Sequence, residues 1–157
     1  MKVLIREATE KDVILVKKYT VETAWESFSD SQKRELKREE WEEHLLSGFE
    51  KLSRAKNSSI FVAEDEEQAF LGYLWVGEGT NMMTGKNHGF IYDIFVKGEH
   101  RGRGIGKLLL QKAEEYCLEK GYSRILLMVS VNNQPAIKLY ENVGFKTVEM
   151  YMEKELK

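Results

Sequence analysis

Residues 100–115 read His-Arg-Gly-Arg-Gly-Ile-Gly-Lys-Leu-Leu-Leu-Gln-Lys-Ala-Glu-Glu, so three alternate glycines stand directly before an amphipathic helix. Glycines at 102, 104 and 106 let successive backbone N–H groups turn toward one point without Cβ clashes, and a helix N-terminus adds about half a positive charge there. Full positive charges surround the same point, at Arg101, Arg103 and Lys107. The stretch therefore predicts a turn that binds phosphate groups.

Two better-known phosphate loops do not fit this stretch. A Walker A loop requires a glycine where Arg101 stands and a Ser or Thr where Leu108 stands. A dinucleotide fingerprint begun at Gly102 requires a glycine at the position of Lys107. The alternative is a plain helix entry, but three glycines flanked by three cations are more than such an entry needs.

The length and composition of the chain predict one globular domain, residues 1–157. The chain has 42% hydrophobic and 32% charged residues, which is typical of a globular protein. Its formal charge of −2 argues against a broad nucleic-acid-binding face. The longest apolar run, Ile125 to Val129, is far too short to span a bilayer, so we expect a cytoplasmic protein without a membrane partner.

Cysteine and histidine usage gives no sign of a disulfide or a metal centre. Cys117 is the only cysteine, and its spacing from Leu109 and Ala113 favours a buried position on one helix face. The three histidines are scattered through the sequence without metal-ligand spacing. We therefore expect no metal cofactor.

Hydrophobic periodicity predicts an α/β domain, α+β by some schemes, with a mixed central sheet of about six strands flanked by about four helices. A capping box at Thr9 starts the first helix, and the consecutive apolar residues 125–129 are typical of a strand covered on both faces and parallel to strand 90–96. Residues 29–31 interrupt the helical pattern. The expected strands are 2–6, 60–63, 69–76, 90–96, 125–129 and 145–154; the expected helices are 9–27, 37–54, 105–120 and 133–144; a glycine-rich loop covers 77–89.

Two motifs in this sequence resemble those of the GNAT superfamily of N-acetyltransferases. The family's phosphate motif matches Arg101 to Gly106, and a second signature matches Asn133, Ala136, Tyr140 and the Gly144-Phe145 pair. The specific resemblance covers residues 60–147, whereas residues 1–59 agree only in the order of their elements. The resemblance implies a single GNAT-like N-acetyltransferase domain over residues 1–157.

The resemblance also implies acetyl-CoA as the cosubstrate and indicates the residues that bind it. The pantetheine arm would pair with the exposed main chain of a strand, at Ile94, Phe95 and Val96, and backbone N–H groups there would face the thioester carbonyl. Asn133 would contact the pantetheine amides, unless it serves only as a helix N-cap. Tyr140 would also belong to the cofactor-binding residues. The pyrophosphate would lie on the amides of Arg101, Gly102, Arg103, Gly104, Ile105, Gly106 and Lys107.

Acetylation of an amine requires two proton transfers. A lysine-type amine has a pKa near 10.4, so a base or a water relay must remove its proton at neutral pH. Asp93 is the candidate base, and the alternative is that it accepts hydrogen bonds from a neighbouring loop; strand alternation places Tyr92 on the opposite face. Tyr140 is, by the resemblance, the acid that protonates the leaving thiolate, and its alternative role is packing between Ile137 and Gly144.

The sequence thus predicts an acetyl-CoA-dependent N-acetyltransferase in which an amine attacks the thioester directly. The acceptor stays open: a polyamine or another small amine, an aminoglycoside or a protein N-terminus, contacted by the two amino-terminal helices and the loop 77–89. The alternatives are a non-catalytic CoA-binding sensor or partner-binding module, and a loop that binds nucleotide phosphates. The resemblance and an exposed final strand also suggest a homodimer.

Overall fold

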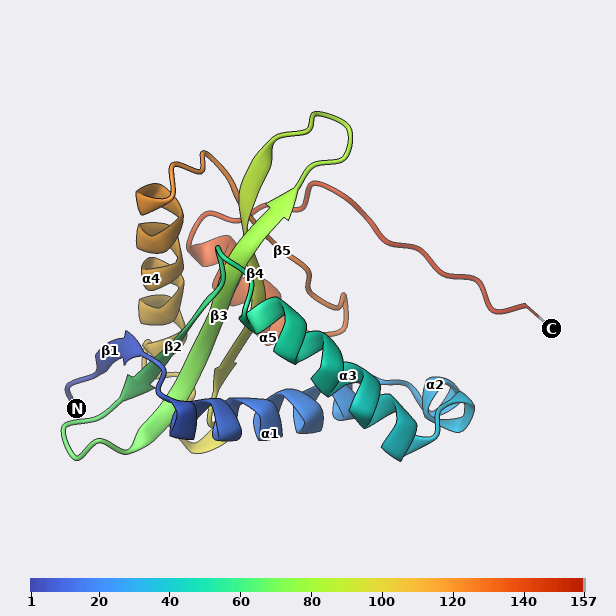
Figure 1. Cartoon of the computed structure of the whole chain (residues 1–157), viewed down its shortest axis with the longest axis horizontal. Coiled ribbons are helices and arrows are strands. Elements are labelled where there is room, and N and C mark those ends of the chain that lie inside the picture. Colours follow the sequence, from blue (N-terminus) through green and yellow to red (C-terminus); the bar gives the residue numbers. More distant parts are fainter. Residues whose placement is uncertain (157) are drawn as a thin grey trace.

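A five-stranded sheet runs through the computed structural model, which describes residues 1–156 (Figure 1). The strands follow their order in the chain, β1-β2-β3-β4-β5; each neighbouring pair is antiparallel except β4 and β5, which are parallel. The strands are β1 (Leu4–Glu7), β2 (Ser59–Glu64), β3 (Phe70–Thr80), β4 (Asn87–Val96) and β5 (Ile125–Leu127). The helices are α1 (Glu10–Ser27), α2 (Asp30–Glu35), α3 (Arg38–Ser53), α4 (Ile105–Glu119) and α5 (Gln134–Asn142), with a 3-10 turn at Gly98–His100.

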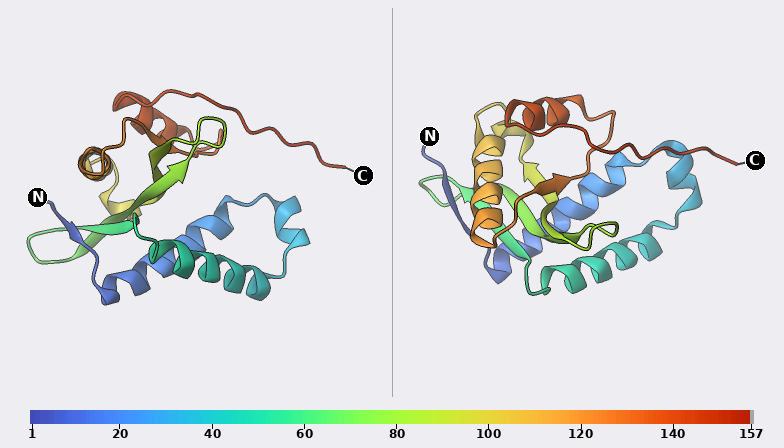
Figure 2. Two further views of the ribbon diagram at one scale, coloured as in Figure 1. Left: turned by 45° about the horizontal axis from the view of Figure 1, so that its top comes forward. Right: turned by 90° about the horizontal axis from the view of Figure 1, so that it is seen from above.

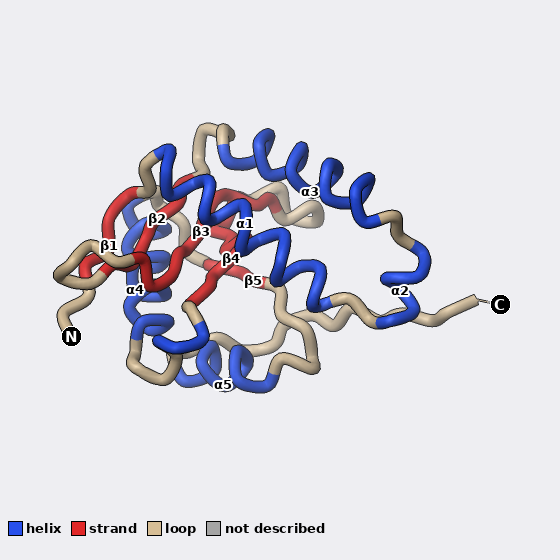
Figure 3. Tube along the Cα trace, turned by 90° about the horizontal axis from the view of Figure 1, so that it is seen from below, coloured by secondary structure: helices blue, strands red, loops and turns tan. Residues whose placement is uncertain are grey.

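Helices cover both faces of the sheet, as the sequence predicted for a mixed α/β domain (Figure 2). On one face, α1 and α3 run beside each other across the strands and bury a cluster that includes Val16, Phe49 and Trp75 (Figure 3). On the other face, the apolar stripe of α4 buries Leu109 and Ala113 against β2, β3 and β4, and α5 packs beside it. Because both faces are covered, the molecule has two hydrophobic cores, one on each face of the sheet.

The amino-terminal elements form as the sequence predicts. Thr9 caps α1 through a complete capping box with Asp12, and α1 ends at Ser27. The Asp12 carboxylate also accepts a hydrogen bond from Arg6 at 2.7 Å, and Arg6 bonds Glu64 on the neighbouring strand at 2.9 Å. This network fixes the start of α1 to the edge of the sheet and lowers the pKa of Asp12, although burial of the carboxyl opposes that shift.

Two expectations for the middle of the chain are wrong in detail. Residues 30–35 form the helix α2 instead of a simple break, because Ser29 and Gln32 make a second capping box. The expected loop 77–89 is mostly strand: β3 runs to Thr80, β4 begins at Asn87, and only residues 81–86 turn between them. The hairpin contains several glycines, which made its sequence resemble a loop. Those in the strands are there because neighbouring side chains leave no room for a Cβ at these positions.

The carboxyl-terminal third departs from the prediction at its end. The strand expected at 125–129 pairs parallel with β4, as predicted, but covers only Ile125–Leu127. The strand expected at 145–154 is not formed: after Phe145, which packs against the core, the chain continues to residue 156 as an extended segment (Figure 1). Near its end, Glu155 accepts a hydrogen bond from Ser31 of α2 at 2.7 Å. The described residues therefore contain five strands, with β5 at the open edge of the sheet. Within residues 1–156, no helix has the length and apolarity needed to cross a membrane.

Candidate active site

The turn before α4 has the backbone conformation that an anion site requires. Gly102 and Gly104 adopt left-handed φ angles of 76° and 81°, Arg103 between them does not, and α4 begins at Ile105. Alternation of left- and right-handed residues turns successive N–H groups into a concave nest that binds anions, and the helix N-terminus adds positive potential. A Cβ built on Gly102 or Gly104 meets no heavy atom within 4 Å, so the nest faces open space.

The residues on either side of the turn fix it to the rest of the fold, through a hydrogen bond before it and close helix packing after it. The Arg101 Nε donates to the Val96 carbonyl oxygen at 3.1 Å, which fastens the turn to the end of β4. Gly106 has a different role from the two glycines before it, because a Cβ there would lie 2.9 Å from Leu139 Cδ2 on α5. Gly106 therefore allows α4 and α5 to pack closely, and Arg103 and Lys107 remain exposed around the nest.

A β-bulge in β4 changes the direction of the candidate base. Trp75 pairs with Asp93 and Val76 pairs with Ile91, so Tyr92 is an extra residue on β4. The Tyr92 ring lies 4.9 Å from the Trp75 ring, on the α1/α3 face of the sheet. Asp93 faces the same side, so the expectation that Tyr92 lies on the opposite face is wrong. Strict alternation fails because a bulge shifts the side-chain register by one residue.

Strands β4 and β5 separate at the bulge. The last pair of their parallel ladder is Ile91 with Leu127, and in the described chain β4 continues for five residues, 92–96, without pairing to β5. The predicted binding residues Ile94, Phe95 and Val96 lie in this unpaired half. Their main chain is consequently available to an extended ligand along that edge.

The Asp93 carboxylate lies in a largely buried hydrogen-bond network. Tyr73 on β3 donates its hydroxyl to Asp93 Oδ2, and Thr20 on α1 donates to the same oxygen at 3.1 Å. Burial raises the pKa of Asp93, while these hydrogen bonds act in the opposite direction. The sequence alternative was correct that Asp93 accepts hydrogen bonds, but its side-chain donors come from a strand and a helix. A carboxylate with a raised pKa accepts a proton more readily than an ordinary aspartate does.

Tyr140 reaches the site from the other side of the sheet. It lies half-buried on α5, packs against the core beneath α4, and contacts the Phe145 ring edge-on with ring centroids 5.9 Å apart. Burial raises the pKa of Tyr140, and the negative charge of Asp93 raises it further. The phenol therefore keeps its proton at neutral pH and interacts electrostatically with the Asp93 carboxylate.

Asn133 serves as the N-cap of α5. Its Oδ1 accepts a hydrogen bond from the Ala136 backbone N–H at 3.3 Å. This is the structural alternative recognised in the sequence, and it leaves the side-chain amide N–H donors available to another partner. The role of Asn133 in cofactor binding stays a prediction.

Sequence reasoning missed Thr20 and Tyr73, the two donors to Asp93. Thr20 follows the fully buried Val16 by four residues, so it is a polar residue on the inward stripe of α1. Tyr73 is a fully buried tyrosine whose hydroxyl requires a partner. The available signal was a polar group at an inward-facing position of α1 and another at an inward-facing position of β3. The sequence did not show that these two positions lie next to each other.

Comparison with known proteins finds relatives of this chain. A model of the acetyltransferase (GNAT) family matches residues 19–145. Thialysine N-epsilon-acetyltransferase of Sus scrofa is 34% identical over 151 residues, which cover 90% of this chain and 83% of that protein. The chain spans only 26% to 42% of the length of four other curated relatives.

Solved structures agree with this assignment. A putative acetyl transferase from Pyrococcus furiosus superposes with a TM-score of 0.83 at 33% identity. The match covers 99% of this chain and 100% of the Pyrococcus chain. AAC(6')-Iy, in complex with the bisubstrate analogue CoA-S-monomethyl-acetylneamine, superposes with a TM-score of 0.71, covering 100% of this chain and 99% of its own. At 18% identity, that second likeness concerns the fold alone. The anion nest, the separated strands β4 and β5, and the family match over residues 19–145 together show that this chain belongs to the GNAT acetyltransferase family.

Proposed function

We propose that this protein is an acetyl-CoA-dependent N-acetyltransferase in which a primary amine attacks the thioester directly. One observation carries the proposal: the unpaired edge of β4 joins the anion nest at one end to the Asp93 and Tyr140 pair at the other. An elongated ligand with a phosphate head and a reactive tail fits that arrangement. The proposed domain comprises the whole chain, residues 1–157, and the cytoplasmic location expected from the sequence stays a prediction.

Acetyl-CoA fits the chemistry of these groups. Its pyrophosphate would accept hydrogen bonds from the amides of residues 101–107, where Gly102 and Gly104 leave open space. Its pantetheine arm would add as a strand along residues 94–96, and the amide N–H groups of Asn133 would reach the same arm. The CoA-containing complex of AAC(6')-Iy supports the choice of ligand. Backbone N–H groups of β4 would stabilise negative charge on the thioester oxygen.

The proposed reaction moves two protons. The acceptor first loses its ammonium proton to solvent. The free amine nitrogen then forms a bond to the carbonyl carbon while the C=O π pair moves to the oxygen, and the second proton that the nitrogen must lose passes to Asp93, directly or through water. The carbon–sulfur bond then breaks, and the thiolate takes the proton of the Tyr140 hydroxyl. Tyr140 recovers its proton from solvent, and Asp93 loses its proton to solvent before the next cycle. The raised pKa of Asp93 favours proton uptake, because an ordinary carboxylate would be a much weaker base at pH 7.

The acceptor is proposed only as a class. A small primary amine, such as a polyamine or an amino-acid-like amine, is supported by the relation to a thialysine acetyltransferase. A protein N-terminus is the second acceptor class that the sequence left open. The α1/α3 face is the side from which either acceptor would reach Asp93, since Asp93 faces α1.

Release of free thiol from acetyl-CoA tests the proposal directly. A panel of alkylamines, polyamines, amino acids, aminoglycosides and peptides is offered to the full chain, and thiol is measured against time. We expect at least one amine to give thiol release above background hydrolysis. Tyr140→Phe should lower that turnover at least tenfold and leave the affinity for CoA unchanged; the matched variant Tyr151→Phe, in the exposed tail, should change neither. A protein that binds CoA yet acetylates nothing would instead be the non-catalytic CoA-binding module.

The same measurements separate a nucleotide-binding loop from a CoA site. Ligand binding raises the melting temperature in proportion to the logarithm of ligand concentration over Kd. We expect acetyl-CoA to raise the melting temperature more than ATP does at equal concentration. An equal or larger shift with ATP would favour nucleotide binding.

We propose further that two copies of the chain form a homodimer through the extended segment 145–156. Its Val148, Met150 and Met152 alternate along the segment and are 67%, 77% and 85% exposed. The open edge at β5 continues into Met128 and Val131, which are 74% and 73% exposed. An unpaired edge beside an unpaired apolar segment is an unstable combination in a monomer. The segment of one copy would therefore pair with the β5 edge of the second.

The oligomeric state tests the dimer. Light scattering of the full chain at micromolar concentration should give twice the chain mass. The double substitution Met150→Lys and Met152→Lys places two charges in the proposed contact and should give the mass of one chain, with unchanged circular dichroism. A single-chain mass for the unsubstituted protein, or a dimer unaffected by the two lysines, would contradict the proposal.

A further inference from the structure

An apolar cavity of about 190 Å³ lies between α1, α3 and β3. Leu45, Phe49 and Leu52 of α3 form one wall, and Trp75 of β3 forms another. Phe49 and Trp75 pack against each other with ring centroids 4.7 Å apart, so the two walls are in contact at the base of the cavity. Thr20, His44 and Gly48 complete the lining, so no carboxylate occurs among the described residues that line it, and the cavity is open to solvent on one side.

Two lining residues place this cavity beside the proposed base. Thr20 contributes to the cavity wall and donates its hydroxyl hydrogen bond to Asp93 at 3.1 Å. Trp75 is the direct cross-strand partner of Asp93 in the β3–β4 ladder. Residues directly opposite one another on a sheet face have Cβ atoms about 5 Å apart. The cavity and the Asp93 carboxylate are thus neighbours on the α1/α3 face.

The lining selects a chemical class of ligand. Apolar surface removed from water is stabilised, whereas a second ammonium group placed against this lining would give up part of its hydration without gaining a carboxylate partner. A cavity of about 150 Å³ in a protein core holds benzene, so 190 Å³ accommodates roughly a phenyl ring or a six-carbon chain. The polycationic acceptors among the candidates fit this lining poorly.

We propose that the cavity binds the apolar body of the acceptor, an alkylamine or arylalkylamine whose amino group lies at Asp93. The inference rests on the proposed acetyl transfer and narrows the acceptor to amines that carry a hydrocarbon body on one side. Polyamines, aminoglycosides and other acceptors with several charges are disfavoured. The amine nitrogen lies at the mouth beside Thr20, and the carbon body lies between α3 and Trp75.

A homologous series of amines tests the inference through binding. Propylamine, butylamine, pentylamine and hexylamine are titrated calorimetrically into the full chain saturated with CoA. Each methylene buried should lower Kd by about fourfold. Hexylamine should bind at least tenfold more tightly than 1,4-diaminobutane. A flat series, or tighter binding of the diamine, would overturn the inference.

Gly48 supplies the variant that fills the cavity. It lines the cavity on α3, and a Cβ built there meets no heavy atom within 4 Å, so the side chain of Gly48→Leu starts into open space at the cavity. Leucine is also a better helix former than glycine. The matched control is Ser47→Leu, at an exposed neighbouring position that does not line the cavity. We expect Gly48→Leu to abolish the dependence of Kd on chain length and Ser47→Leu to preserve it.

The outcomes separate this inference from the proposed function. If the binding series holds but no amine releases thiol from acetyl-CoA, the acetyltransferase proposal fails and the apolar amine site stands. If amines with several charges and amines with a hydrocarbon body release thiol equally, the acetyltransferase proposal stands and the cavity has no role in selecting the acceptor. An unchanged series in Gly48→Leu would likewise refute the role of the cavity.

Discussion

Replacing Gly104 with alanine separates the two consequences of its left-handed conformation. Gly104 has φ of 81°, and a Cβ added there meets no heavy atom within 4 Å, so the stability cost of Gly104→Ala comes from the backbone alone. A non-glycine residue in this region costs about 1–2 kcal/mol. For a chain of this length, that loss corresponds to a fall of about 2–8 °C in melting temperature.

Gly121 provides a matched control for the strain. Its φ is 80°, the space around its Cβ is also open, and it follows the C-terminal end of α4, at the opposite end from the nest. Gly121→Ala should therefore lower the melting temperature of the free protein by a similar amount. Only at Gly104 does the new methyl group enter the space that we assign to the pyrophosphate.

The ligand-induced shift distinguishes the two variants. At a ligand concentration one hundred times Kd, acetyl-CoA stabilises the protein by about 2.7 kcal/mol. A tenfold loss of affinity in Gly104→Ala would reduce that figure to about 1.4 kcal/mol at the same concentration. Thermal unfolding with and without acetyl-CoA measures both numbers, and calorimetry gives Kd. Equal ligand-induced shifts in the two variants would refute the assignment of the nest.

Three further results are expected from unfolding and chemical probes. Because the pKa of Asp93 is raised above its ordinary 3.8, the folded state binds the carboxyl proton more tightly than the unfolded state does. This contribution to stability is complete below pH 3.8 and is lost as the pH rises through the pKa of the folded state. Asp93→Asn should therefore show a smaller fall in the free energy of unfolding above about pH 4 than the unsubstituted protein does. Burial raises the pKa of Cys117 to about 11, so a thiol reagent at pH 8 should label it only as the protein unfolds, and fast labelling of the native state would contradict its burial. Gly72→Ala would place a Cβ 2.3 Å from the Phe95 carbonyl oxygen and should lower the melting temperature, whereas Gly48→Ala should not; equal melting temperatures would argue against the close approach of β3 and β4.

The parts of the fold that local sequence encodes were predicted well. The capping box at Thr9, the start of α4 at Ile105 and the left-handed Gly121 after it each depend on residues within one turn of helix. The parallel pairing of 125–127 with β4 followed from a run of consecutive apolar residues. Such features are visible because the interacting groups are close in sequence.

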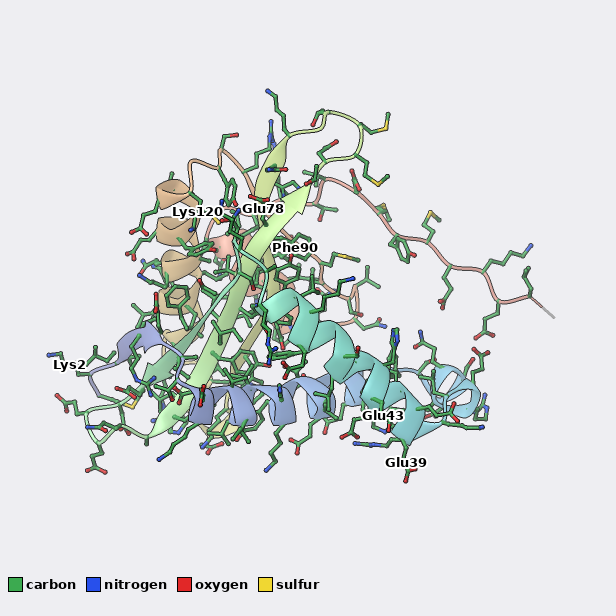
Figure 4. All side chains as sticks on the ribbon, in the orientation of Figure 1. Lys2, Glu39, Glu43, Glu78, Phe90 and Lys120 are labelled. Atoms are coloured by element: carbon green, nitrogen blue, oxygen red, sulfur yellow. The ribbon has the colours of Figure 1, made fainter. Side chains whose placement is uncertain are left out.

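The parts that depend on distant residues were not predicted. The β4 bulge arises from the register between β3 and β4, and no residue type at Tyr92 announces it. The network around Asp93 joins Thr20 and Tyr73 across 73 and 20 positions of sequence. Glu78 is similar: its carboxylate accepts from Tyr122 across 44 positions, beside the end of α4 (Figure 4). Periodicity assigns faces to strands, but it does not report which element covers each face.

The groups of the proposed chemistry were chosen from the sequence, because two of them lie inside motifs. Tyr140 and the glycine turn belong to stretches whose spacing the family shares. Asp93 was chosen as a carboxylate within an apolar strand, and the structure gives it a buried network and a raised pKa. The acidic residues of α3 are different: Glu39 and Glu43 lie at the outer end of that helix, away from the sheet (Figure 4). The cluster of acidic residues on α3 is therefore not part of the proposed active site.

The bulge has a direct consequence for the proposed mechanism. If β4 alternated regularly through Tyr92, Asp93 would face the α4/α5 side of the sheet, where Tyr140 lies. Because Tyr92 is bulged, Asp93 faces the α1/α3 cavity while Tyr140 stays on the other side of the sheet. The gap between β4 and β5 would then connect the proposed base, on the side of the amine, to the proposed acid, on the side of the sulfur. In the proposed mechanism the amine would attack and the thiolate would depart on different sides of the carbonyl carbon, so one bulged residue would provide the separation that the two proton transfers require.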